Sequence, residues 1–257
     1  MTDFNNNDLF FISTYIGPLS LLDISNNFKK IENAHYFFFT NIEKNLIKNN
    51  SWNIITIDKN FLELLKNNLN NNSVKISRYF KFNVYSYFSK YLNININNKF
   101  VFYCDSYLYP KYNINWIGIC SKLSKNDLPI IQYNHKRNFG GIKLDLECIV
   151  KGNKEILKNI KKTEEYLNNI NSKVNISTPQ YFENTVIGFY SNEKVIQLCD
   201  QFWKFYIQCP TYRDQPLWNF IYLHNNKKPF IDNNFRSYFD GIKKIERKVK
   251  EYKDANL

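Results

Sequence analysis

The order of apolar and polar stretches is the feature that most constrains the fold of this 257-residue chain. Three short, β-prone runs, at Leu9–Tyr15, His35–Thr40 and 53–57, are separated by polar segments with helical character. This alternation is typical of βαβ units, in which parallel strands pair and helices cover the sheet. The sequence therefore predicts an α/β domain with a mixed, mainly parallel sheet.

The same pattern continues along the chain. Residues 99–104 form another apolar run that ends in Asp105. Further strands are predicted at 130–133, 144–150 and 185–189, and helices at 60–68, 75–91, 155–170, 193–206 and 215–224. A chain of this length fits a single core, so we expect one domain over residues 1–240 and a charged helix or tail over 241–257.

The net charge of +12 raises the possibility of a nucleic-acid partner. The lysines and arginines are scattered, however. Their densest group, within residues 243–253, is interleaved with acidic residues at helical spacing. That spacing is typical of a solvated helix face, and no nucleic-acid motif accompanies it. We therefore expect no nucleic-acid partner and keep a basic nucleic-acid binder as the least favoured hypothesis.

The cysteines and the hydropathy of the chain indicate in which cell compartment we expect the protein. Five cysteines are an odd number and include no CxxC pair, which favours reduced thiols. The longest nearly apolar run, residues 9–22, is interrupted by polar residues, glycine and proline, and no basic segment precedes it. The sequence predicts no signal peptide, no membrane anchor and a cytoplasmic location.

Asp105 is the first candidate for chemistry, because ligands of open α/β sheets collect at the carboxyl ends of strands. A carboxylate there can hold Mg²⁺ or Mn²⁺ against a diphosphate. Ser106 and Tyr107 follow, where a DxD pair would supply a second aspartate, so the metal is less firmly predicted than the site. The alternative is that Asp105 caps the turn after its strand.

Arg78 and Lys81 lie one turn apart on the helix predicted before this strand. Cationic side chains can balance the charge of a diphosphate, so the pair is a candidate for phosphate binding. The alternative is a basic pair that faces solvent.

A second constellation opens the predicted helix at 215–224. Arg213, Asp214 and Gln215 stand together just before Pro216, a residue that fits the first turn of a helix. Asp214 can act as a general base or bind an acceptor hydroxyl, Gln215 can bind a sugar hydroxyl, and Arg213 can contact phosphate. The alternative is that Asp214 is an ordinary N-cap and Arg213 a surface residue.

Histidines supply weaker candidates. His135 and Arg137 follow a predicted strand, with Glu147 beyond Gly140 and Gly141. Imidazole can bind phosphate or a metal, but a single histidine is more often structural. His224 begins a segment with faint similarity to the HxxGxxKPW ending of family-8 glycosyltransferases, in which the histidine ligates the metal; the spacing here is short and the glycine is absent.

Taken in order, these segments resemble the glycosyltransferase-like domain family of plant seed-mucilage and turgor-regulation proteins and their bacterial relatives. The resemblance rests on a first strand ending in a glycine turn, an aromatic strand that ends in Thr40-Asn41, an R..K helix and a strand that ends in Asp105. It continues through an H..R…E segment, a segment that begins at Glu183, and the RDQ motif at 213–215. Where the family often has an arginine, this chain has Gly188-Phe189-Tyr190.

The resemblance implies a GT-A-like, Rossmann-like fold and transfer of a hexose or similar sugar from a UDP- or GDP-sugar to a glycan or glycoprotein. It implies catalytic roles for Asp214 and Asp105 and a metal at Asp105; His224 is a weak second metal candidate from the family-8 similarity alone. The donor side would include Arg78, Lys81, Asp105, Ser106, Thr40 and Asn41. The acceptor side would include Arg213, Gln215, His135, Arg137, Glu147 and Glu183. A catalytically degenerate binding module and a hydrolase stay open as alternatives.

Overall fold

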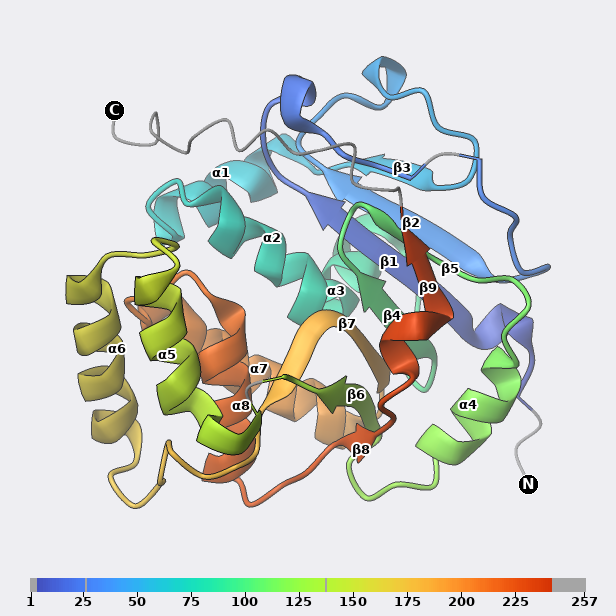
Figure 1. Ribbon diagram of the computed structural model, residues 1–257. Coiled ribbons are helices and arrows are strands. Elements are labelled where there is room, and N and C mark those ends of the chain that lie inside the picture. The colour runs from blue at the N-terminus through green and yellow to red at the C-terminus, as the bar shows by residue number, and fades with distance from the viewer. Residues whose placement is uncertain (1–3, 26, 137, 242–257) are drawn as a thin grey trace.

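The computed structural model describes residues 4–25, 27–136 and 138–241 (Figure 1). Its main sheet has the strand order β3-β2-β1-β4-β7-β6-β8. β7 runs antiparallel to both of its neighbours, and the other pairs are parallel. The strands are β1 (Leu9–Tyr15), β2 (His35–Thr40), β3 (Asn53–Thr56), β4 (Phe100–Cys104), β6 (Ile130–Asn134), β7 (Phe182–Tyr190) and β8 (Phe230–Ile231).

Helices cover both faces of this sheet (Figure 1). They are α1 (Lys59–Asn68), α2 (Ser73–Phe82), α3 (Val84–Tyr87), α4 (Trp116–Leu123), α5 (Gly141–Lys151), α6 (Leu157–Ile170), α7 (Glu193–Gln208) and α8 (Asp214–His224). A small second sheet pairs β5 (Leu108–Pro110) with β9 (Phe239–Gly241). The mixed, mainly parallel α/β sheet predicted from the sequence is confirmed, and the described residues form one domain. Residues 242–257 of the predicted charged tail lie outside the described residues.

Alternation along the strands divides the core into two layers. In β1, Phe10 and Ile12 face the layer that contains α2, α7 and α8, whereas Leu9 and Phe11 face the layer that contains α4. Successive side chains of a strand point to opposite faces, so a central strand buried on both sides is apolar at every position. This is why a central strand such as β4 is a continuous apolar run instead of an alternating one.

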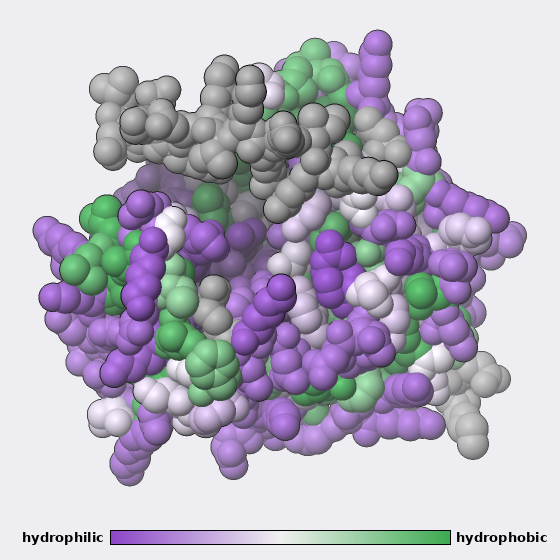
Figure 2. All heavy atoms as spheres, viewed as in Figure 1, coloured by the Kyte–Doolittle hydropathy of each residue, from purple (hydrophilic) through white to green (hydrophobic). Residues whose placement is uncertain are grey.

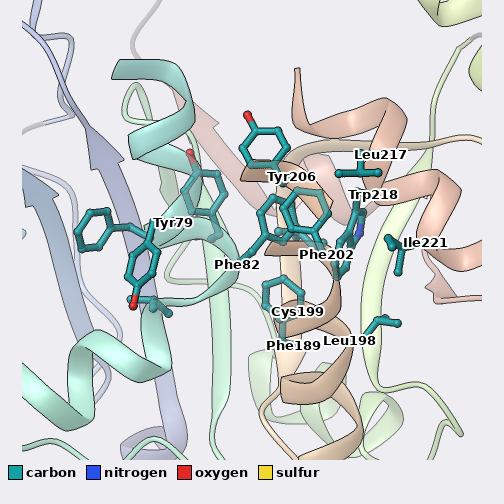
Figure 3. Close-up of a cluster of buried hydrophobic side chains, with 14 of the residues drawn as sticks. Tyr79, Phe82, Phe189, Leu198, Cys199, Phe202, Tyr206, Leu217, Trp218 and Ile221 are labelled. Carbon is teal, nitrogen blue, oxygen red and sulfur yellow. The ribbon is translucent and has the colours of Figure 1, made fainter. Parts of the chain in front are cut away.

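The layer between α2, α7 and α8 is rich in aromatic rings (Figure 3). Phe82 of α2 packs against both Phe202 of α7 and Trp218 of α8, with ring centroids 4.3 and 4.6 Å away. Rings at such separations gain attraction beyond their burial. The contacts fix α2 against α8, and the polar ends of these two helices meet in the candidate site.

One predicted strand is wrong. Residues 144–150 lie within helix α5, and not in a strand. Its buried residues include Ile142, Leu146 and Ile149, which are spaced by four and three as on one face of a helix. The apolar run was short enough to fit either period, and packing against α8 and α6 selects the helix.

The single helix predicted at 75–91 is interrupted. It comprises α2, then Asn83 at φ −119° and ψ 20°, then α3 and a π-helical turn at Phe88–Leu92. Asparagine competes with the helical backbone for hydrogen bonds, which favours a helix end at such a residue. The interruption lets Tyr87 and Phe88 pack edge-on against Phe39 of β2.

Gly188 of β7 is required by the core. A Cβ atom at this position would lie 2.6 Å from atoms of Ile131 and of Phe102. We therefore expect Gly188→Ala to lower the free energy of unfolding by about 1–3 kcal/mol through overpacking, measured by urea unfolding. Gly152→Ala, whose nearest neighbour would lie at 3.2 Å on the surface, is the control and should change stability less. Equal effects would contradict this view of the core.

The topology gathers several strand ends at one edge of the main sheet, which we call the carboxyl edge. β1, β2, β4 and β6 run in the same direction and end there, and β7 begins there because it is antiparallel to β4 and β6. Asp105, His135 and Glu183 therefore lie on the same edge. Within the described residues, no helix is long and apolar enough to cross a membrane.

Candidate active site

A polar cavity opens at the carboxyl edge, between the ends of β4, β6 and β7 and helices α2, α5 and α8. Figure 2 shows this face of the molecule hollowed, with hydrophilic residues around the hollow. The cavity has a volume of about 240 Å³. It is lined by Arg78, Lys81, Asp105, His135, Asp145, Cys148, Ile149, Lys154, Glu183, Asn184, Thr185, Arg213, Asp214 and Gln215. The segments predicted separately from the sequence thus converge on one cavity.

Asp214 is the centre of the charged network in this cavity. Its Oδ1 accepts a hydrogen bond from Arg78 Nε at 2.9 Å, and its Oδ2 accepts one from Lys81 Nζ at 2.9 Å. Asn184 Nδ2 donates a third, to Oδ2, at 3.0 Å. The side chains of Lys81 and Asp214 are only 2% and 8% exposed, so this is a buried ion-pair network.

Burial and charge both shift the pKa values of Asp214, Lys81 and Arg78. Burial alone would raise the pKa of Asp214, but the charges of Arg78 and Lys81 and the hydrogen bonds to its oxygens hold that pKa below its usual value. Burial lowers the pKa of Lys81, and the charge of Asp214 only partly offsets this. For Arg78, burial lowers the pKa, but the acidic groups around it, Asp214 foremost and then Tyr103 and Asp105, together outweigh burial and raise the pKa. We conclude that Asp214 is an ionised carboxylate and a weak base.

The structure decides between the alternatives stated above for Asp214 and for the pair Arg78 and Lys81. Arg213, and not Asp214, is the N-cap of α8, and Asp214 is the first helical residue. Arg78 and Lys81 do not form a solvent-facing pair, because both bind Asp214 in the cavity. Both cations are therefore part of the cavity and are held by Asp214, unlike lysines and arginines that extend into solvent.

Asp105 directly follows β4, and its carboxylate contacts neutral partners. The turn after β4 is closed by the backbone, with Leu108 N donating to Asp105 O at 2.8 Å. The carboxylate instead accepts a hydrogen bond from the Tyr103 hydroxyl at 3.1 Å. Burial, together with the charge of Asp105, raises the pKa of Tyr103 far above its usual value, so this hydroxyl stays a donor. No cation among the described residues lies within ion-pair distance of Asp105.

The side chains around Asp105 show whether the protein alone could hold the expected metal ion. Among the described residues, no group of three His, Cys, Asp or Glu could hold a metal ion. A preformed protein site for Mn²⁺ or Mg²⁺ therefore does not fit. The residues do fit the mode in which one carboxylate binds Mg²⁺ and the oxygens of a substrate phosphate and water complete the coordination.

His135 and Glu183 form a second pair in the cavity. His135 Nε2 lies 3.2 Å from Glu183 Oε2, and the other oxygen of Glu183 accepts a hydrogen bond from the Thr185 hydroxyl at 3.0 Å. The imidazole follows β6 and the carboxylate begins β7, so neighbouring antiparallel strands place them side by side. A carboxylate beside an imidazole fixes its ring orientation.

Gln215 presents a free donor within this cavity. Its Nε2 is buried and has no hydrogen-bond partner among the described residues. A buried polar atom without a partner costs free energy, which an oxygen of a bound ligand would recover. Arg213, half-buried beside it, lines the same cavity.

Other predicted site residues lie outside the cavity lining. Thr40 is buried at the end of β2, where its Oγ1 accepts from Ile42 N, and the side chain of Asn41 accepts from Gly17 N. Glu147 is exposed on α5. Ser106 is half-buried in the turn after Asp105 but does not line the cavity. Arg137 lies outside the described residues.

His224 is also remote from the cavity. It ends α8, and its ring stacks on Phe220 at 5.9 Å and lies 3.2 Å from the Asn171 amide. The site residues that helix α8 contributes, Asp214 and Gln215, lie at its opposite end. His224 therefore does not share a site with Asp105.

Six residues of the cavity lining were not predicted as site residues, and three of them, Asp145, Asn184 and Lys154, carry charged or amide side chains. Asp145 of α5 is buried and accepts a hydrogen bond from the Tyr181 hydroxyl at 2.5 Å. Asn184 and Lys154 also line the cavity. The wrong strand at 144–150 hid Asp145, whereas a helical period would have placed it one turn before Cys148 on one face. The resemblance includes Asn184 in the segment that begins at Glu183 but gives it no role, and nothing in the sequence marks Lys154.

Two solved structures illustrate how this chain compares with known proteins. No family model and no curated protein sequence matches the chain, so membership of the seed-mucilage family stays a prediction. The apo structure of mouse xyloside xylosyltransferase 1 is similar with a TM-score of 0.47 and 11% identity, over 87% of this chain and 84% of that chain. The S. cerevisiae mannosyltransferase Ktr4p has a TM-score of 0.36 and 12% identity, over 84% of this chain and 66% of that chain. Both named proteins are glycosyltransferases, but likenesses this distant carry no argument about the function of this chain.

Proposed function

We propose that the chain is a glycosyltransferase that takes a sugar from a nucleoside-diphosphate donor and transfers it to a hydroxyl of a glycan or glycoprotein. The observation that carries the proposal is the convergence of Arg78, Lys81, Asp105 and Asp214 on one polar cavity at the carboxyl edge of the sheet. Ligands of open α/β sheets bind at this edge.

The cations of the cavity suit a leaving diphosphate. Arg78 and Lys81 carry two positive charges against the single charge of Asp214, and Arg213 lies next to Asp214 in the chain. Their positions are fixed before any ligand arrives, because Asp214 holds both cations by hydrogen bonds. Preorganised charges stabilise developing negative charge without reorganisation, which is the largest contribution in many enzymes.

The acceptor would bind in the same cavity, near His135, Glu183 and Gln215. The unpaired Nε2 of Gln215 can donate to a sugar hydroxyl, and the His135–Glu183 pair can accept a proton from the attacking hydroxyl. Asp214 suits a base poorly, because its pKa is held low by two cations. We therefore propose a charge-holding role for Asp214 in place of the general-base role predicted from the sequence.

A divalent cation remains part of the proposal. Asp105 would provide one ligand oxygen and the diphosphate would provide others. The cation would neutralise charge on the diphosphate as the glycosidic bond breaks.

The proposal is tested by thermal unfolding with UDP, GDP, CDP and their sugars, each with Mn²⁺ or with EDTA. A ligand present at a hundredfold excess over its Kd should raise the midpoint by about 5–10 °C. UMP and free glucose, which lack the diphosphate, are the matched controls and should have little effect. If no nucleoside diphosphate or sugar nucleotide shifts the midpoint, with or without Mn²⁺, the proposal is wrong.

A binding module that has lost catalysis is the second candidate. It is favoured by the single carboxylate at the metal position, with Ser106 and Tyr107 following Asp105. It predicts saturable binding of a nucleotide sugar without release of the nucleotide.

A further inference from the structure

A buried chain of side-chain amides connects the core of α8 to Asp214. Gln132 of β6 is fully buried, and its Oε1 accepts hydrogen bonds from the Trp218 indole N–H at 3.3 Å and from the Tyr222 hydroxyl. Its Nε2 donates to Asn184 Oδ1 at 2.7 Å and to the Glu183 carbonyl at 3.1 Å. Asn184 Nδ2 then donates to Asp214. All polar atoms of the Gln132 amide therefore have partners.

The direction of this chain is fixed at its α8 end. An indole N–H is a donor only, so it faces the oxygen of the Gln132 amide and turns the amide nitrogen toward β7. Asn184 then has to present its oxygen to Gln132 and its nitrogen to Asp214. Trp218 cannot easily rotate, because it packs against Phe82 and Phe202 with ring centroids 4.6 and 5.2 Å away (Figure 3).

The backbone at Gln132 also departs from a regular β-ladder. The ladder between β6 and β7 shifts register between Ile131, which pairs with Gly188, and Tyr133, which pairs with Glu183. Such interruptions of a ladder re-aim side chains and are frequent beside active sites. Here the interruption lies where the amide of Gln132 contacts Asn184.

We propose that Gln132 and Asn184 are positioning residues, which set the orientation of Asp214 and thereby hold Arg78 and Lys81 ready for an anionic diphosphate. This rests on the proposed function for the identity of the ligand. Neither residue lies in the predicted site, and Gln132 does not line the cavity. Its effect on ligand binding would pass through Asn184 and Asp214.

Gln132→Glu tests the proposal, because the introduced carboxyl group changes its hydrogen bonding with pH. Burial should raise the pKa of that carboxyl. When protonated, it can donate to Asn184 as the amide does; when ionised, it cannot. Affinity for UDP and for inorganic pyrophosphate, relative to the wild type, should fall by about tenfold or more as the pH rises through this titration.

Gln132→Leu is the matched control, since it has similar size and no ionisable group. Its affinity should be lower than that of the wild type by a factor that does not change with pH. Ionisable groups on the surrounding strands and on α8 include Tyr133, His135, Glu183, Asp214 and Tyr222. Taking each ratio to the wild type at the same pH cancels their own titration. A constant ratio for Gln132→Glu, or unchanged affinity in Gln132→Leu, would overturn the proposal.

A ligand-free measurement separates this proposal from the proposed function. The unfolding temperature of Gln132→Glu relative to the wild type should fall over the same pH range, and the fall should shrink in an Asp214→Asn background, where an amide replaces the carboxylate. If the wild type binds neither probe but this coupling is present, the proposed function fails and the positioning role stands. If the fall is the same in both backgrounds, the positioning role fails.

Discussion

Asp214→Ala is expected to lower the free energy of unfolding by about 3–5 kcal/mol, because it leaves two buried cations without their counter-ion. Lys81 is 2% exposed and Arg78 is 19% exposed, so water can replace little of what the carboxylate provides. Urea unfolding at neutral pH measures the loss. The affinity for nucleoside diphosphates should also change, since the positions of both cations depend on Asp214.

Asp127→Ala is a matched control for this prediction. Asp127 also contacts two lysines, Lys194 at 3.0 Å and Lys227 at 2.9 Å, but its side chain is 68% exposed. Exposed ion pairs contribute little to stability, so this variant should unfold almost as the wild type does. Adding Lys81→Met to Asp214→Ala should recover part of the lost stability, because it removes an uncompensated buried charge. Similar losses for Asp127→Ala and Asp214→Ala would contradict the buried network.

Asp105→Asn is expected to reduce donor turnover by about a hundredfold or more while leaving the unfolding midpoint unchanged. The carboxylate is half-buried and binds only the Tyr103 hydroxyl among the described residues, so the fold depends little on its charge. The amide keeps the size and can still accept that hydrogen bond. Turnover is followed as release of nucleoside diphosphate from the donor that stabilises the protein best.

Asp200→Asn provides the comparison for Asp105→Asn. Asp200 is also half-buried and accepts a hydrogen bond from a tyrosine hydroxyl, that of Tyr85 at 2.6 Å, but it lies on α7 outside the cavity lining. Its replacement should leave turnover unchanged. Wild-type turnover in Asp105→Asn would remove Asp105 from the active site.

The fold class could be predicted because its signal is local. A run such as Phe100–Cys104 is apolar at every position, and only a strand covered on both faces requires that. The errors arose where local signals conflict with packing. Residues 144–150 fit both periods, and only contacts with α8 and α6 select the helix. At Asn83, a helical pattern continues across a residue whose backbone leaves the helix.

The site could be predicted only in part. Asp105 was visible because a carboxylate after an apolar strand marks the carboxyl edge, and Arg213 to Gln215 because they open a helix. The pairing of Arg78 and Lys81 with Asp214 spans 136 and 133 residues of sequence, and no local pattern encodes it. Asn184 is one of many asparagines in this chain. Its role follows only from its two hydrogen-bond partners in space.

Release of nucleoside diphosphate is the most direct test of the central claim that the polar cavity transfers sugar from a nucleotide donor. The wild-type protein is incubated with UDP- and GDP-sugars and a set of glycan acceptors, with Mn²⁺ or with EDTA, and the freed nucleotide is quantified. We predict release from at least one donor, dependent on an acceptor and lost in Asp105→Asn. Absence of release from every donor, or release that Asp105→Asn leaves unchanged, would contradict the account.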